Sequence, residues 1–146
     1  MQHFRKLIDT WRRRRPLKWD EEKFTDQVSD YLKDGGDPNL VISDIGWTLL
    51  HLAAEYSNPD AVRLLVASGG NPNIKDTFGQ SPLYLSIDSA TDSALQTGST
   101  ISFATTAALV AAGADIGLTT NNGETGWDIA RRFGEEVEQL LRSIVG

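Results

Sequence analysis

Apolar residues in this chain recur at helical spacing, in short stretches separated by turns rich in glycine and asparagine. The helices that this pattern predicts span residues 3–15, 20–33, 48–55, 59–67, 125–133 and 135–144. Their clearest apolar stripes are Phe4, Leu7, Ile8 and Trp11, then Phe24, Val28, Tyr31 and Leu32, and last Val137, Leu140, Leu141 and Ile144. Pro16 and Gly35 end the first two helices. The pattern therefore predicts an all-α protein.

Two segments of the chain repeat each other at a distance of 33 residues. The segment G-W-T-L-L-H-L-A-A at 46–54 returns as G-Q-S-P-L-Y-L-S-I at 79–87. Similarly, L-V-A-S-G-G-N-P-N at 65–73 resembles both L-K-D-G-G-D-P-N at 32–39 and L-V-A-A-G-A-D at 109–115. A period of this size, with a T-P-L-H-like start and a G-A-D-like end, resembles the ankyrin repeat.

The resemblance implies one domain over residues 1–146, an ankyrin-repeat solenoid of about four antiparallel helix pairs joined by tight β-turn or hairpin loops. The expected units are a degenerate N-terminal capping repeat at 1–42, complete repeats at 43–75 and 76–119, and a C-terminal capping repeat at 120–146.

The second complete repeat departs from this regularity. Gly69 and Gly113 lie 44 residues apart instead of 33, so eleven residues are inserted near 90–102. This stretch is rich in Ser, Thr and Asp, and we expect a surface loop between the two helices of the repeat. It is either a tolerated insertion, because loop length costs little, or a recognition loop on the binding side.

Charge divides the chain into two parts. Residues 1–18 carry a net charge of +6, and residues 19–146 carry −12. The arginine run at 12–15 could serve as a nuclear address, a nucleic-acid patch or a lipid contact, or it could end a helix and pair with the acidic body. Nucleic-acid binding is disfavoured, because the whole chain carries −6. Without a signal-like or membrane-length apolar run, we expect a soluble, cytoplasmic protein.

Candidate chemistry is sparse. The chain has no cysteine, which excludes thiol catalysis and cysteine-ligated zinc. His51 matches the histidine of the T-P-L-H motif, which the resemblance makes structural, and its counterpart Tyr84 is a poor metal ligand. The acidic runs begin helices, where carboxylates suit the helix dipole. We therefore predict no catalytic residue, no metal, no cofactor and no small-molecule substrate, and a chain that is not an enzyme.

The resemblance also implies a concave recognition surface, formed by the turn tips and the exposed side of each first helix. The matching positions are Asp44, Ile45, Trp47, Glu55, Tyr56, Thr77, Phe78, Gln80, Asp88, Ser89, Asn121, Asn122, Glu124, Arg132 and Phe133. Aromatic groups rimmed by carboxylates are typical of an interface centre.

Two functional hypotheses follow. In the first, the chain is a non-catalytic binding module, and the acidic concave face of a monomer binds a basic protein. A more specific version is that it inhibits that partner, since small stand-alone ankyrin proteins look like some bacterial immunity proteins that occlude a cognate toxin. In the second, the chain is a structural adaptor or assembly subunit that uses the concave face together with the basic N-terminal helix.

Overall fold

The computed structural model describes residues 21–146, and every regular element in that range is an α-helix. The helices are α2 (Glu21–Lys33), α3 (Leu49–Glu55), α4 (Pro59–Ala67), α5 (Pro82–Thr97), α6 (Ala104–Ala111), α7 (Gly126–Phe133) and α8 (Glu135–Val145). Each helix predicted within this range is present, with ends that agree within one residue. The helix predicted over 3–15 lies outside the described residues.

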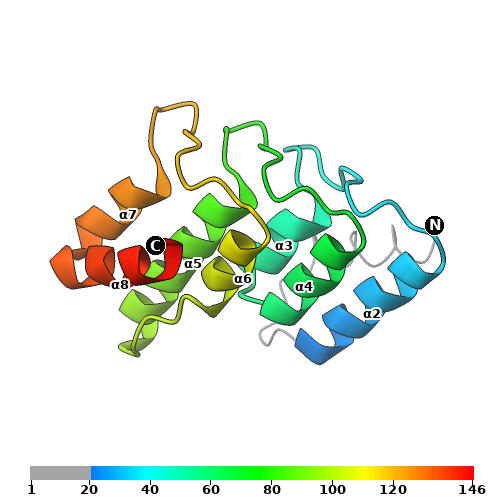
Figure 1. The fold of residues 1–146 in the computed structure, drawn as a ribbon, viewed down its shortest axis with the longest axis horizontal. Helices are drawn as coiled ribbons and strands as arrows, with labels where there is room; N and C mark the ends of the chain where they lie inside the picture. The colour runs from blue at the N-terminus through cyan, green and yellow to red at the C-terminus, as the bar shows by residue number, and fades with distance from the viewer. Residues whose placement is uncertain (1–20) are drawn as a thin grey trace.

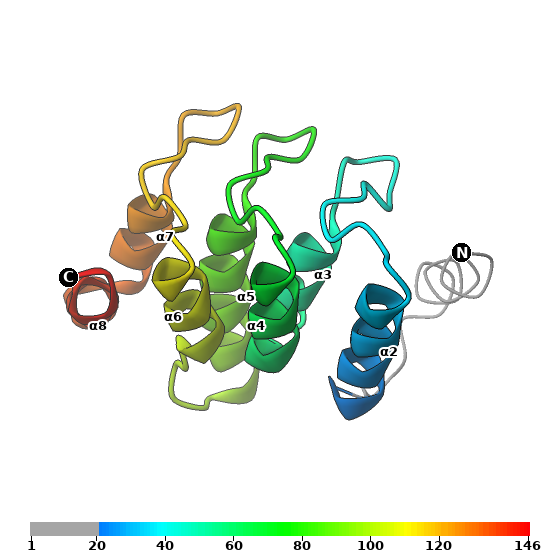
Figure 2. The same ribbon diagram turned by 45° about the vertical axis from the view of Figure 1, so that its right-hand side comes forward.

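The helices form two rows (Figures 1 and 2). In the first row α5 contacts both α3 and α7, and in the second row each of α2, α4, α6 and α8 contacts the next. Across the rows α3 pairs with α4, α5 with α6, and α7 with α8. The hairpin turns project from one common edge (Figure 2). This arrangement is the solenoid of helix pairs that the 33-residue period predicts.

Local sequence explains where the short helices begin. The side chain of Asn58 accepts a hydrogen bond from the backbone N–H of Ala61 at 3.1 Å, and Ser81 accepts one from Tyr84 at 3.2 Å. These N-caps satisfy backbone donors that have no partner within the helix. Pro59 and Pro82 follow the caps, at positions where a missing N–H costs nothing.

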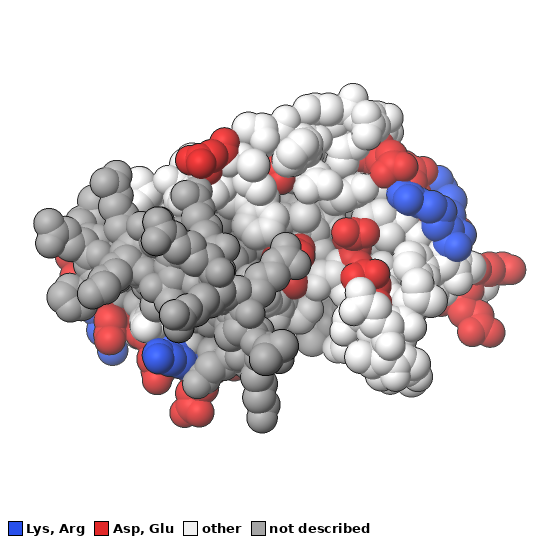
Figure 3. All heavy atoms as spheres, turned by 180° about the vertical axis from the view of Figure 1, so that it is seen from behind, with Lys and Arg blue, Asp and Glu red and all other residues white. Residues whose placement is uncertain are grey.

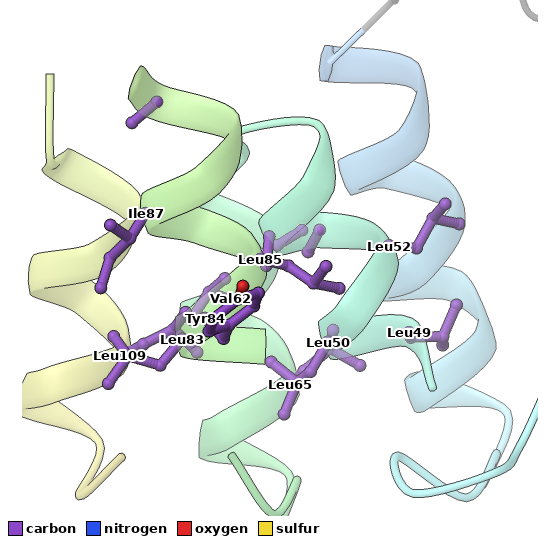
Figure 4. Close-up of a cluster of buried hydrophobic side chains, with 14 of the residues drawn as sticks. Leu49, Leu50, Leu52, Val62, Leu65, Leu83, Tyr84, Leu85, Ile87 and Leu109 are labelled. Carbon is purple, nitrogen blue, oxygen red and sulfur yellow. The ribbon is translucent and has the colours of Figure 1, made fainter. Parts of the chain in front are cut away.

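Leucine side chains from four helices fill the space between the rows (Figure 4). The leucines with at most 1% of their surface exposed in α3 to α6 are Leu49, Leu50, Leu65, Leu83 and Leu109. Ala53 and Ala54 are fully buried where neighbouring helices meet, and their small side chains allow that close approach. Each repeat buries its apolar face against the next, so the core is continuous.

The structure contradicts two details of the sequence analysis. Residues 90–97 are not a loop: α5 continues through them to Thr97, and Gly98 ends the helix in a left-handed conformation with φ of 68°. Burial of Ala90 and Thr91 explains this difference, because their contacts outweigh the weak helix propensity of the stretch. Leu140 and Leu141 were both predicted to be buried; Leu141 is buried, but Leu140 is 41% exposed.

Candidate functional site

The tips of the three hairpin turns lie side by side along one edge of the solenoid (Figure 2). The backbone N–H of Thr77 donates to the carbonyl of Ile45 at 2.9 Å, and that of Asn121 donates to the carbonyl of Phe78 at 3.0 Å. The side-chain amide of Asn121 also donates to the carbonyl of Thr77 at 2.8 Å. These hydrogen bonds bring together four of the residues predicted to bind a partner.

Ile45 and Phe78 give this row an apolar character. Their side chains are 38% and 56% exposed, although both residues stand on turns fixed by hydrogen bonds. Asp44 and Asn122 are exposed beside them at the first and third tips. An aromatic ring held in solvent by a rigid turn is typical of an interaction surface.

Trp47 and Gln80, also predicted to contact a partner, lie deeper. The indole Nε1–H of Trp47 donates to Asp76 at 3.0 Å, and the indole ring stacks on His51 with centroids 6.3 Å apart. The other carboxylate oxygen of Asp76 accepts the backbone N–H groups of Phe78 and Gln80, each at 2.9 Å. Trp47 is half-buried, so it supports the tips from below.

Sequence reasoning missed the residue that organises each turn. Asp76 holds the second turn, while Ser43 accepts the backbone N–H of Trp47 at 3.0 Å in the first. Thr120 accepts that of Glu124 at 3.3 Å in the third. In every turn an oxygen-bearing side chain therefore caps the N–H four residues onward. The recurrence of Ser, Asp or Thr three residues before each turn glycine is the signal that could have revealed it.

Two further predicted residues, Glu124 and Arg132, meet Tyr84 between α5 and α7. The hydroxyl of Tyr84 donates to a carboxylate oxygen of Glu124 at 2.9 Å, and Arg132 pairs with the same oxygen at 3.0 Å. Burial, followed by the bond to the Glu124 carboxylate, raises the pKa of Tyr84 to about 12. The position equivalent to His51 thus holds a neutral phenol at physiological pH.

Asp88 lies one turn beyond Tyr84 on α5. Partial burial raises the pKa of the Asp88 carboxyl, and the negative charges of Asp92 and Glu124 raise it further, while Arg132 opposes the shift. The charged form of Asp88 is therefore under repulsion from its neighbours. A cation brought by a partner would relieve that repulsion.

The remaining predicted residues surround these two groups. The hydroxyl of Ser89 donates to the backbone carbonyl of Glu55 at 2.7 Å, which ties α5 to the end of α3. Glu55 and Tyr56 are half-buried, and Tyr56 packs against the core. Phe133 is 39% exposed at the end of α7. The predicted positions thus form one surface, the α3–α5–α7 face with its tips, rather than one pocket.

The described part of the chain carries an excess of negative charge, which extends over the α3–α5–α7 face. Residues 21–146 carry eighteen acidic and seven basic side chains. Where the side behind the view of Figure 1 is visible, carboxylates spread across it and the basic side chains lie toward its edges (Figure 3). A surface of this kind attracts cationic partners.

Comparison with known proteins agrees with the repeat architecture. A family model for ankyrin repeats in many copies matches residues 31–85. Over 61 residues the chain is 38% identical to an ankyrin repeat-containing protein of Schizosaccharomyces pombe, P1E11.10, covering 42% of this chain and 29% of that protein. Residues 31–85 of this chain are thus ankyrin repeats.

Two further relatives are much longer proteins. The Neurogenic locus Notch protein of Drosophila melanogaster is 33% identical over 67 residues, which are 46% of this chain and 2% of Notch. The human neurogenic locus notch homolog protein 1 is 34% identical over 68 residues, which are 47% of this chain and 3% of that protein. The chain thus matches only a small part of these relatives. The ankyrin repeat that the family model finds in this chain is a unit that generally mediates protein–protein interaction.

The ankyrin histidine has a structural role here. The backbone N–H of Thr48 donates to Nδ1 of His51 at 3.1 Å, so the ring proton lies on Nε2, 3.0 Å from the carbonyl of Gln80. His51 therefore links α3 to the turn of the next repeat.

Over the described residues 21–146, His, Asp and Glu form no cluster suited to a metal ion. Within the same range, no helix has the length and apolar character to cross a bilayer.

We predict that Asp88→Asn stabilises the fold slightly. The neutral amide removes the cost of burying a charge and the repulsion with Asp92 and Glu124, but solvent screens this partly buried site, so the expected gain in the free energy of unfolding is about 0.3 kcal/mol. Urea unfolding at low salt, compared with Asp60→Asn as a control, measures it. Asp60 forms an ion pair with Arg63 at 2.9 Å, so its substitution brings no gain. A stability loss in Asp88→Asn would contradict the prediction.

Proposed function

We propose that this ankyrin-repeat protein binds a basic protein through the α3–α5–α7 face and its turn tips, without catalysing a reaction. The observation that carries the proposal is the exposed Phe78 ring, presented on a hydrogen-bonded tip above a face with excess carboxylates. Buried aromatic groups at the centre of an interface supply much of the binding energy. Carboxylates around them favour a cationic partner and accelerate its association.

Inhibition by occlusion is the more specific form of this proposal. A rigid acidic surface that covers the basic site of another protein blocks that site without any chemistry of its own. Immunity proteins that neutralise a cognate toxin act in this way. The inhibitor would act as a monomer, because its excess negative charge repels a second copy.

An adaptor is the second candidate, and the separation of charge favours it. Residues 1–18 carry +6, opposite in sign to the rest of the chain, so they could hold an acidic partner while the acidic face holds a basic one. The adaptor requires two separable partners. The inhibitor requires only one.

We predict that Phe78→Ser weakens partner binding by roughly tenfold or more, because a central aromatic anchor is lost. The test is affinity capture from native lysate with wild type, Phe78→Ser, Asp88→Asn, a chain lacking residues 1–18 and the control Leu140→Ser. Leu140 is 41% exposed on α8, in the other row of helices. One basic protein that Phe78→Ser alone loses supports the proposal, and its activity with and without this chain then tests inhibition.

Two other results would change the interpretation. A partner that is retained by Phe78→Ser and Asp88→Asn but lost when residues 1–18 are deleted would favour the adaptor. An acidic partner, or one that only Leu140→Ser loses, would contradict binding at the acidic face.

A further inference from the structure

Helix α5 is twice as long as its neighbours in the first row. It spans sixteen residues, Pro82–Thr97, whereas α3 has seven and α7 has eight. Residues 89–97 extend it beyond the position where α3 ends, by about 13 Å at 1.5 Å per residue. The lower end of α5 and its connection to α6 project on the side opposite the turn tips (Figure 2). Stacking of the repeats does not require this length.

The extension is held at both of its ends. Ala90 and Thr91 are buried, and the hydroxyl of Thr91 donates to the carbonyl of Ile87 at 2.9 Å. At the far end, the N–H of Gly98 donates to the carbonyl of Ala94 at 2.9 Å. The last turn of α5 is therefore a capped helix that presents its side chains at defined positions.

One stripe of the extended helix combines charge with an apolar side chain. Asp88, Asp92 and Leu95 follow one another at i, i+4 and i+7, so they lie on the same side of α5. Leu95 is 72% exposed, more than any other large apolar side chain among the described residues. In that same part of the chain, neither aspartate forms an ion pair; Asp92 accepts only the side-chain amide of Gln96 at 2.8 Å.

We infer that these three residues, the Asp88–Asp92–Leu95 stripe, extend the proposed binding surface. The stripe binds a partner segment that presents two basic side chains beside one apolar side chain. The inference rests on the proposed function and adds a second anchor to it. Two unpaired carboxylates select cationic groups, and Leu95 requires an apolar contact about 5 Å along the helix from Asp92. The partner therefore spans from the tip of Phe78 to the end of α5.

Charge argues against a second copy of this chain as the occupant. A symmetric dimer through Leu95 would place Asp88 and Asp92 of one copy near those of the other, without compensating cations. Burial and then the repulsion from neighbouring carboxylates already raise the pKa of Asp88, and such a dimer would increase that repulsion. A basic partner lowers it instead.

The test uses a phage-displayed library of random 16-residue peptides, selected on the wild-type chain. The selected peptides are made synthetically, and their affinity is measured by fluorescence anisotropy for wild type, Leu95→Ser, Asp92→Asn, Phe78→Ser and the controls Leu95→Met and Leu140→Ser. We expect basic peptides with an aliphatic or aromatic residue. Leu95→Ser should weaken them about tenfold and Asp92→Asn several-fold, whereas Leu95→Met and Leu140→Ser should bind like wild type.

The outcomes separate the inference from the proposed function. If basic peptides lose affinity for Phe78→Ser but not for Leu95→Ser, the inference that the stripe binds the partner is wrong and the proposed function stands. Three results would overturn both the inference and the proposed function: selected peptides that lack basic residues, no enrichment of any peptide, or affinities that no variant changes. If sedimentation detects a dimer and Leu95→Ser abolishes it, the stripe binds a second copy of this chain, which would overturn the inference. Thermal unfolding at the wild-type temperature verifies that each variant is folded.

Discussion

Gly79→Ala is expected to lower the free energy of unfolding by about 2–4 kcal/mol, because a side chain at this position meets two separate obstacles. Gly79 adopts φ of +75°, a left-handed conformation that alanine resists. A Cβ atom there would also lie 2.7 Å from both the backbone nitrogen and the side-chain oxygen of Asn121. Relief of this contact must separate the second tip from the third, since Asn121 donates to Phe78 and Thr77.

The other turn glycines provide a graded control for this prediction. Gly123 has nearly the same φ, +78°, but a Cβ atom would meet nothing within 4 Å, so Gly123→Ala measures backbone strain alone, about 1 kcal/mol. Gly46, with φ of +82° and a nearest contact of 3.4 Å, should fall between the two. Urea unfolding of the three variants tests the order. Equal losses at Gly79 and Gly123 would show that contact between the tips contributes nothing.

His51→Ala is also expected to lower the free energy of unfolding, by about 2–4 kcal/mol. The imidazole is fully buried, and its removal leaves the backbone N–H of Thr48 without a partner, takes away one of the two hydrogen bonds to the carbonyl of Gln80 and opens a cavity beneath Trp47. His51→Asn should lose less, because its amide oxygen can still accept from Thr48. Urea unfolding at pH 7.5 measures both variants. If His51→Ala and His51→Asn lower the free energy of unfolding equally, the hydrogen bond to Thr48 does not stabilise the fold.

The same residue should make stability depend on pH. Burial lowers the pKa of His51, although its bonds to backbone carbonyls and the charge of Asp76 oppose the shift. Above pH 6.5 both folded and unfolded chains hold a neutral imidazole, so its contribution is complete. As pH falls below 6.5, the unfolded chain takes up a proton that the folded chain resists, and stability declines. Between pH 6.5 and 5, His51→Asn should show a shallower decline than wild type. Parallel profiles would contradict this assignment.

Local interactions explain why so much of the fold was predictable. The N-cap at Asn58, the proline that follows it and the small residues Ala53 and Ala54 act within one or two helical turns, so their meaning is visible in sequence. The 33-residue period then determines how the helix pairs stack, because each apolar face can be buried only against the next repeat. For the same reason the turn tips, with Ile45 and Phe78, were predicted as surface positions.

The tertiary structure decided what depends on distant partners. Tyr84 and Glu124 meet across 40 residues, and Trp47 is held by Asp76 from the following repeat, so neither contact has a signal in its own segment. Composition favoured a loop at 90–97, but burial of Thr91 made these residues helical and projected Leu95 into solvent. Sequence alone thus determined the repeats, the helix ends and the acidic charge, which arise from local hydrogen bonding, periodicity and composition. The identity of the buried, paired and exposed side chains on the α3–α5–α7 face followed only from packing between repeats.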